Sequence, residues 1–113
     1  MNKRATAQLA ESAESVDFSE LGRFLVALGD PTRQQIVMAL SRERLNVNQL
    51  ADRFPLSRPA MSHHLKVLSH GGLLVQERQG RERVYRVNVG RCRQLVDQLK
   101  AFISTCCAGP ECC

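Results

Sequence analysis

The sequence predicts a mostly α-helical fold with one β-hairpin wing, a winged helix-turn-helix, and three observations predict it. Apolar residues recur at helical spacing in several short segments that follow N-cap residues. Two of these segments are separated only by a tight turn at 55–57, and the stretch after them alternates around a polar turn. The chain has 113 residues, 43% of them hydrophobic and 24% charged, which suits one small domain.

The first two predicted helices are separated by an aspartate–proline pair. Asp17, followed three residues later by Glu20, forms an N-cap pattern, and apolar residues at helical spacing then continue to about Gly29. Asp30 at the N-cap and Pro31 at the first helical position start a second helix. The sequence therefore predicts two helices joined by a very short connection.

The third and fourth predicted helices form the helix-turn-helix. Asn46, with Gln49 three positions later, caps a short third helix that Pro55 prevents from continuing. Ser57 can cap a fourth helix, which ends at the glycine pair beginning with Gly71. Two short helices joined by such a tight turn are typical of a helix-turn-helix.

A hairpin and a last helix complete the predicted fold. The stretch LLVQERQGRERVYRVN has β-prone residues on both sides of a polar turn at 79–82, which predicts a β-hairpin. A last helix then begins at about Arg91. Its apolar residues form a continuous stripe at helical spacing: Cys92, Leu95, Val96, Leu99, Phe102 and Ile103.

Positive charge is concentrated in one part of the chain. Between Arg58 and Arg93 there are eight basic and two acidic residues, whereas the whole chain has a net charge of +5. Such a basic half favours a polyanionic partner, and a solvated charged face is the alternative. No apolar run could serve as a signal-peptide core or cross a membrane, so we expect a cytoplasmic protein without a membrane partner.

The stretch SHHLKVL contains two adjacent histidines, and helical geometry separates them. If Met61, Leu65 and Leu68 form the buried face of the fourth helix, Ser62, His63 and Lys66 lie on the opposite face and His64 lies on the flank. His64 is then a packed or capping histidine, and a metal site shared with His63 is disfavoured. The exposed face has the hydrogen-bonding groups that a DNA major groove accepts.

The predicted hairpin carries arginines around its turn. Arg78, Arg81, Arg83 and Arg86 have the chemistry of a basic wing that contacts phosphates or enters a minor groove. Together with the fourth helix, the hairpin supplies these candidate DNA-binding residues: Ser57, Arg58, Ser62, His63, Lys66, Arg78, Arg81 and Arg83.

The sequence resembles the ArsR/SmtB family of winged-helix metalloregulatory repressors over about Leu21 to Val87. The resemblance rests on LGDPTRQQIVMAL and on LNVNQLADRFPLSRPAMSHHLKVLSHGGLLVQERQGRERVYRV. It implies a homodimer that binds a palindromic double-stranded operator and releases it when a metal or metalloid ion binds. It also implies that the chain is not an enzyme.

Two inducer sites known in this family are not matched here. Many arsenic-responsive members have a cysteine pair at the start of the third helix, where this sequence has Asn46-Val47-Asn48-Gln49. The zinc-type site needs aspartate, histidines and glutamate in the last helix, but here only Asp97 is present and no histidine follows His70. A zinc or nickel site in the last helix is therefore not expected.

A cysteine cluster at the end of the chain is the remaining candidate inducer site. Four of the five cysteines lie in the last eight residues, CCAGPECC. Trivalent arsenic and antimony prefer soft thiolate ligands and are satisfied by three of them. The break at Gly109-Pro110 could fold the second pair back onto the first. The candidate ligands are Cys106, Cys107, Cys112 and Cys113.

Other interpretations of the cysteine cluster remain open at this stage. Four thiolates also suit a tetrahedral zinc or cadmium site, and a redox-sensing dithiol pair or an unstructured tail are further alternatives. A thiol enzyme of the arsenate reductase type is disfavoured, because no anion-cradling loop lies between a strand and a helix. Cys92 lies on the apolar stripe of the last helix and is expected in the core or at a dimer contact.

These observations predict three parts of the chain. Residues 1–15 are small and polar and are expected to form a flexible arm, and residues 16–104 the DNA-binding and dimerisation domain. Residues 105–113 are the predicted metalloid-binding tail. The apolar stripes of the first and last helices exceed the need of so small a core, so we expect them to pack on a second subunit.

Overall fold

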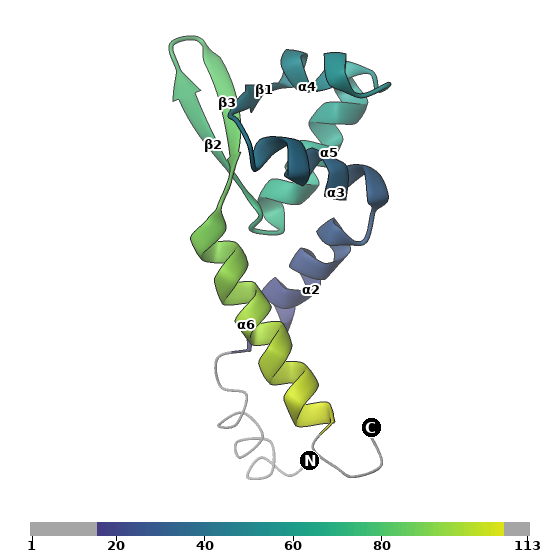
Figure 1. The fold of residues 1–113 in the computed structure, drawn as a ribbon, viewed down its shortest axis with the longest axis vertical. Helices are drawn as coiled ribbons and strands as arrows, with labels where there is room; N and C mark the ends of the chain where they lie inside the picture. The colour runs from purple at the N-terminus through teal and green to yellow at the C-terminus, as the bar shows by residue number, and fades with distance from the viewer. Residues whose placement is uncertain (1–15, 108–113) are drawn as a thin grey trace.

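The structure, a computed structural model, describes residues 16–107 and contains there five helices and a three-stranded antiparallel sheet (Figure 1). The five helices and the β-hairpin occur in the order that the sequence predicts. The helices are α2 (Phe18–Leu28), α3 (Pro31–Leu40), α4 (Val47–Arg53), α5 (Arg58–His70) and α6 (Val89–Cys106). The strands are β1 (Leu45–Asn46), β2 (Leu74–Gln79) and β3 (Glu82–Val87). The predicted winged helix-turn-helix is confirmed. The arm expected at 1–15, Cys112 and Cys113 lie outside the described residues.

Aspartate side chains cap the first two helices as predicted. The Asp17 carboxylate accepts hydrogen bonds from the backbone N–H groups of Ser19 and Glu20 at 3.0 Å and 3.1 Å. The Asp30 carboxylate accepts one from Arg33 at 3.0 Å. The backbone N–H of Glu20 holds the pKa of the Asp17 carboxyl below its usual value. The backbone N–H of Arg33 does the same for the pKa of Asp30.

Neutral side chains cap the helix-turn-helix. Asn46 and Gln49 form a reciprocal capping box, with backbone-to-side-chain distances of 2.8 Å and 2.9 Å. The Ser57 hydroxyl accepts from the backbone N–H of Ala60 at 3.2 Å. Both predicted helix starts are confirmed, and α4 and α5 meet across the turn between them.

The sheet places the hairpin beside the helix-turn-helix. Its strand order is β1-β3-β2, and β2 pairs with β3 from Leu74 opposite Val87 to Gln79 opposite Glu82. Gly80 in the turn has φ +65°, in the left-handed region that favours glycine. The strand β1 was not predicted, because two residues are too few to show the alternation by which a strand is recognised.

The last helix begins earlier than predicted. We expected its start at about Arg91, but α6 begins at Val89 because the Asn88 side chain accepts from the backbone N–H of Arg91 at 3.1 Å and caps it. At its other end α6 continues through Cys106. In Figure 1 this helix leaves the base of the hairpin and runs past α2. Within residues 16–107, no helix is both long and apolar enough to span a bilayer.

One apolar core lies between the helices and the sheet, and α2 packs closely on the end of α5. Gly71 follows α5, and a Cβ atom there would lie 2.8 Å from the Ala27 Cβ and 3.0 Å from the Arg23 carbonyl oxygen. A glycine at this position therefore permits the approach of the two helices. The largest fully buried side chains are Ile36, Leu45, Leu50, Met61, Leu65, Leu68, Leu73 and Leu95.

Candidate nucleic-acid interface

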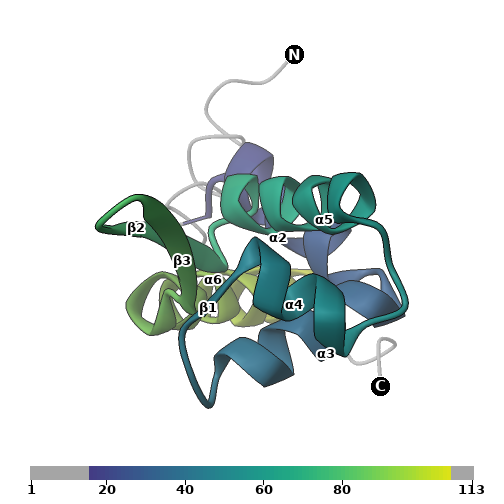
Figure 2. The same cartoon turned by 90° about the horizontal axis from the view of Figure 1, so that it is seen from above.

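Helix α5 presents the polar face that helical geometry predicts. Ser62, His63 and Lys66 are exposed, whereas Met61 and Leu65 on the other face are fully buried. Figure 2 looks down on α4 and α5 and shows the hairpin projecting beside them. The exposed side chains are short hydrogen-bonding groups and one cation, which is the chemistry required to contact base edges and phosphates.

The two adjacent histidines have different surroundings. His63 is exposed, while His64 is half-buried and its Nδ1 lies 3.3 Å from Nη1 of Arg33. The two imidazole centroids are 6.2 Å apart with planes 56° from parallel. Within residues 16–107, no group of three or more histidine, cysteine or acidic side chains is placed to hold a metal ion. Within the part of the chain that the structure describes, the two histidines thus have no third potential ligand beside them.

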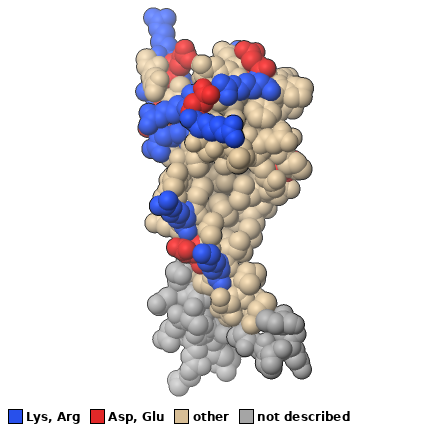
Figure 3. Space-filling view, in the orientation of Figure 1, with Lys and Arg blue, Asp and Glu red and all other residues tan. Residues whose placement is uncertain are grey.

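Three hairpin arginines are exposed and crowd one another. Arg78 on β2 lies directly opposite Arg83 on β3, and Arg81 lies in the turn. Like charges opposite each other across two strands destabilise a hairpin. The electrostatic repulsion within such a cluster is relieved when the arginines bind an anion. The space-filling view shows basic side chains gathered at the hairpin end of the molecule (Figure 3).

The fourth predicted wing arginine differs from the other three. Arg86 Nε lies 3.1 Å from one Glu77 oxygen, and Arg44 Nη1 lies 3.2 Å from the other. The two pairs are close but poorly aligned for hydrogen bonding, since Glu77 Oε1 and Arg86 Nε make no hydrogen bond of good geometry. Glu77 therefore neutralises Arg86 at the base of the wing. Arg44 was not predicted to belong to this surface, because only the fold brings it beside Glu77 of β2.

A shallow hollow of about 290 Å³ joins the wing to the helix-turn-helix. Arg58, the first residue of α5, lines it together with Arg81 and Arg83 from the hairpin. Asn46 at the start of α4 donates a side-chain hydrogen bond to Glu82, which ties the wing to this helix. Ser57 is exposed beside Arg58. The first turn of α5 and the wing therefore present one surface, where the positive end of the α5 dipole adds to the arginine charges.

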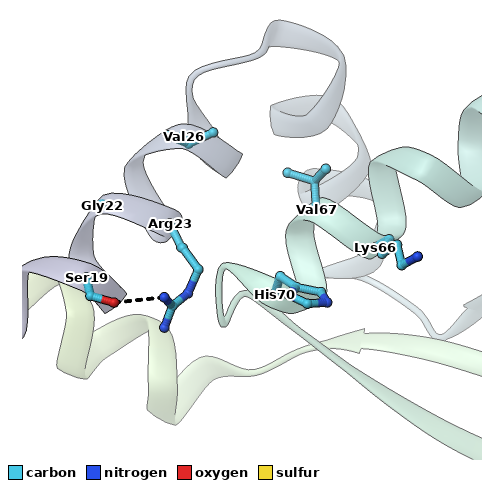
Figure 4. Close-up of a pocket in the computed structure, with 7 residues that line it drawn as sticks. All are labelled: Ser19, Gly22, Arg23, Val26, Lys66, Val67 and His70. Atoms are coloured by element: carbon cyan, nitrogen blue, oxygen red, sulfur yellow. Dashed lines mark hydrogen bonds between the residues drawn. The ribbon is translucent and has the colours of Figure 1, made fainter.

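A second hollow, of about 530 Å³, lies between α2 and the end of α5 (Figure 4). Its walls are mainly apolar and include Gly22, Val26 and Val67. Arg23, Lys66 and His70 also line it, and the Arg23 guanidinium donates to the Ser19 hydroxyl at 2.8 Å, as the dashed line in Figure 4 shows. Lys66 thus lies where the polar face of α5 meets this hollow.

The cysteines of the described residues fall into two environments. Cys106, the last residue of α6, and Cys107 are both exposed. Cys92 is half-buried, and its thiol lies 3.9 Å from the carbonyl oxygen of Leu73. Burial raises the pKa of the Cys92 thiol, which disfavours the thiolate form that binds metal ions. Its predicted place beside the core is confirmed.

Helices α2 and α6 expose apolar side chains along their outer faces. Phe18 is 63% exposed, Val26 66% and Ile103 49%. The Phe18 ring meets the Phe102 ring edge-on, with centroids 5.9 Å apart. Polar contacts also join the helices: the Asp17 backbone N–H donates to Gln98 Oε1 at 3.1 Å. The exposed apolar residues of the two helices therefore meet at the Phe18–Phe102 contact.

Comparison with known proteins identifies the family. Residues 28–77 match the family model described as a helix-turn-helix domain. The chain is 39% identical over 66 residues to the HTH-type transcriptional repressor SmtB of Mycobacterium tuberculosis, a match that covers 58% of this chain and 49% of that protein. It is 33% identical over 73 residues to the arsenical resistance operon repressor of Staphylococcus xylosus, covering 65% of this chain and 70% of that one. The chain belongs to the ArsR/SmtB family.

Solved structures of ArsR/SmtB proteins have the same fold. A possible transcriptional regulator for arsenical resistance is 38% identical, with a TM-score of 0.62 over 70% of this chain and 82% of that one. The chain spans about half the length of the mycobacterial SmtB repressor that it matches. Members of this family are transcription regulators and not enzymes, which confirms the prediction made from the sequence.

Proposed function

We propose that the chain is a homodimeric repressor that binds a palindromic operator and releases it when trivalent arsenic or antimony binds its terminal thiolates. One observation supports the DNA-binding part above all. Arg58 at the start of α5 lines the same hollow as Arg81 and Arg83 of the hairpin. Ser62, His63 and Lys66, further along α5, are exposed. A helix in the major groove with a basic hairpin on the adjacent phosphates uses both surfaces at once.

The exposed apolar stripe of α2 and α6 supports the homodimer. Side chains such as Phe18, Val96 and Ile103 would leave water if two copies paired through this stripe. A twofold dimer would present two copies of α5 to successive turns of the major groove, as the two halves of a palindrome require.

The inducer site is assigned to the terminal cysteines. Cys106 and Cys107 are exposed at the end of α6, and Cys112 and Cys113 follow within six residues of Cys107. Three of these four thiolates would satisfy As(III) or Sb(III), while a four-thiolate site would take zinc or cadmium. The match to repressors of arsenical resistance favours the metalloids.

Release requires that the bound ion favours a state with low DNA affinity. The ion would act at the end of α6, four residues after Phe102, whose ring contacts Phe18 of α2. Nearer its start, α6 also contacts the α2 region through the Asp17–Gln98 hydrogen bond and the Glu20–Arg91 ion pair. A change at this end of α6 would alter how α2 and α6 meet the second subunit. The spacing of the two copies of α5 would change with it.

The test uses the full chain on an operator selected from random duplexes. Arsenite, antimonite, cadmium and zinc are added in turn to the complex with DNA, and release is followed by fluorescence anisotropy. We expect release by arsenite and antimonite, and no release from a variant with Cys106, Cys107, Cys112 and Cys113 all replaced by serine. Cys92→Ser is the matched control and should respond normally.

Three results would contradict this assignment. Release of the four-serine variant by arsenite, or an absent response in Cys92→Ser alone, would place the sensor elsewhere in the chain. Release by zinc or cadmium but not by arsenite would make the tail a four-thiolate divalent-metal site.

A further inference from the structure

The guanidinium of Arg33 joins three helices. Its Nε donates to the carbonyl oxygen of Ala27 at 2.8 Å, and its Nη2 donates to that of Val26 at 3.1 Å. Its Nη1 lies 3.3 Å from Nδ1 of His64. A side chain from the first turn of α3 thus contacts the last turn of α2 and the flank of α5 with all three of its nitrogen atoms.

The contact with α2 has a clear physical basis. The last carbonyl groups of a helix have no intrahelical partner and carry the negative end of the helix dipole, so a guanidinium that binds them stabilises the helix end. The backbone of Arg33 is itself held by the N-cap Asp30, whose carboxylate accepts from the Arg33 N–H at 3.0 Å. The N-cap hydrogen bond therefore fixes the backbone position from which the Arg33 side chain extends.

The contact with His64 defines the state of the imidazole. A guanidinium can only donate hydrogen bonds, so this contact is a hydrogen bond in the tautomer whose Nδ1 accepts and whose ring proton is on Nε2. The hydrogen bond then fixes the direction of the imidazole as well as its position. The apolar contacts of Met61 and Leu65 hold α5 on the core, but they are not directional.

His64 is next to the residues that face outward from α5. The same rotation of the helix that brings His64 to Arg33 turns His63 and Lys66 away from the core. Rotation or sliding of α5 on its apolar face would break the Arg33–His64 hydrogen bond and move the polar face at the same time. This hydrogen bond is therefore coupled to the way α5 is presented.

We propose that Arg33 is a positioning residue for DNA recognition, which sets the rotation of α5 against α2 by holding His64. This inference rests on the proposed function, because it assumes that α5 reads DNA. Arg33 itself makes no contact with the nucleic acid. It acts through His64, and its removal affects the recognition of sequence rather than general attraction to DNA.

The neighbouring residue offers a matched control. Gln34 Nε2 donates to the carbonyl oxygen of Leu28 at 2.7 Å, so this side chain also binds the end of α2. Among the hydrogen bonds of residues 16–107, Gln34 has none with α5. Gln34→Ala therefore removes a bond to the same helix end without altering any bond to α5.

Affinity for the operator selected by the wild-type protein is measured for Arg33→Met, His64→Leu, the double variant, His64→Asn and Gln34→Ala. We expect Arg33→Met and His64→Leu each to weaken operator binding roughly tenfold, with no further weakening in the double variant, because they remove one shared hydrogen bond. Binding to a random duplex should be unchanged. His64→Asn, which can accept near the Nδ1 position, should restore affinity, and Gln34→Ala should bind as the wild type does.

His64→Leu keeps the inference testable if Arg33→Met fails to fold, because it leaves the bonds between Arg33 and α2 in place. Imidazole nitrogen chemical shifts of the free protein give a second readout. We expect the Nδ1 chemical shift of His64 to change in Arg33→Met, because Nδ1 loses its hydrogen-bond partner, and to stay unchanged in Gln34→Ala.

Three outcomes would overturn the inference and show that Arg33 only caps α2. The effects of the two substitutions could be additive, binding to random DNA could be weakened equally, or Nδ1 of His64 could carry a proton in the wild type. A wild-type protein that selects no DNA sequence would instead contradict the proposed function. In that case the nitrogen shifts alone still decide whether Arg33 holds His64.

Discussion

The hairpin end of the molecule, formed by α4, α5 and the β2–β3 hairpin, differs from the pair of helices α2 and α6 in what it exposes. The hairpin end carries Arg78 and Arg83 opposite each other with Arg81 beyond them, a cluster that lowers its energy by meeting an anion. The helix pair exposes Phe18 and Ile103, whose energy is lowered by leaving water. One core thus supports two surfaces that suit opposite kinds of partner.

The two regions also differ in how their charges are arranged. On the hairpin, Glu77 pairs with Arg86 at the base, and residues 78–83 at the tip keep a net charge of +2 although Glu82 lies among them. On α6, Asp97 lies among Arg93 and Lys100, so no basic cluster forms. Basic residues occur in both regions, but only the hairpin end concentrates unopposed charge. Composition alone therefore does not separate the two surfaces, and substitutions confined to one or the other test whether they act independently.

The largest expected effect comes from placing charge on the helix pair. Val96→Asp with Ile103→Asp should convert a dimer into monomers, because two carboxylates would be buried at the interface. Operator affinity should then fall by about 10²-fold or more, because binding is no longer bivalent. Light scattering and a binding titration measure the two effects. Gln94→Asp introduces a carboxylate at an exposed position about 160° around the same helix from Val96 and should remain a dimer. A dimeric double variant would show that the face of Val96 and Ile103 is not the interface.

A smaller effect should follow from neutralising the wing. Arg81→Ala with Arg83→Ala should weaken binding on every DNA sequence and reduce the dependence of log affinity on log salt by about 0.9 for each phosphate that the wing no longer neutralises. Titrations at several salt concentrations measure this slope. Arg44→Ala, which removes an arginine already paired with Glu77, is the control. An unchanged slope in the double variant would refute the wing assignment.

Within the hairpin end, the polar face of α5 should determine specificity. His63→Ala should reduce the binding free energy by about 1–3 kcal/mol on the operator and by almost nothing on random DNA, since a base-edge interaction distinguishes sequences. Competition titrations with both duplexes measure the difference. His70→Ala changes an exposed histidine at the far end of the same helix and should have little effect. Equal reductions on both duplexes would show that His63 binds a phosphate instead.

The capping box tests the stability of the hairpin end. Asn46→Ala removes the N-cap of α4 and the hydrogen bond to Glu82, and should lower the free energy of unfolding by about 1 kcal/mol. Urea denaturation measures this change. Asn48→Ala removes the same type of side chain from an exposed position two residues later, and should leave the free energy of unfolding almost unchanged. A cost at Asn48 equal to that at Asn46 would show that the cap is unimportant.

The smallest effect concerns acid, and it distinguishes the caps of α2 and α3 from those of α4 and α5. The pKa of Asp17 and that of Asp30 are lowered by folding, so their contribution is present above the ordinary carboxyl pKa of about 4 and is lost as pH falls through the folded values. Asparagine also caps helices but does not titrate. Asp17→Asn with Asp30→Asn should therefore flatten the decline in melting temperature between about pH 5 and pH 2. An unchanged decline would assign acid sensitivity to other carboxylates.

The prediction of the helices succeeded where the decisive interaction is local. At the starts of α2 to α5 a side chain accepts from a backbone N–H two or three residues later, as Asp30 does from Arg33 and Asn46 from Gln49. The equally local cap of α6 at Asn88 was not predicted. Such interactions are encoded by residues close together in the chain. The exposed face of α5 was predicted for the same reason, since a helix has a fixed angle between successive side chains.

The predictions were incomplete where a structural feature depends on a residue that is distant along the chain. Strand β1 exists because Leu45 and Asn46 pair with Tyr85 and Val84, which are remote from them along the chain. Arg86 resembles the other wing arginines in the sequence, and only the structure places Glu77 against it. The Cys112 and Cys113 assignments stay predictions, because they lie outside the described residues.

The sequence by itself determined the order of the helices, the hairpin turn at Gly80 and the chemistry of the two surfaces, because caps, turns and periodicity act over a few residues. Only the tertiary structure decided which charges are neutralised and which side chains face outward. Phe18 and Leu25 share a helical stripe with the buried Leu21 but lie exposed, since α5 and α6 cover only part of α2. Likewise, three helices must pack before Arg33 can reach Ala27 and His64, because no single helix contains these residues.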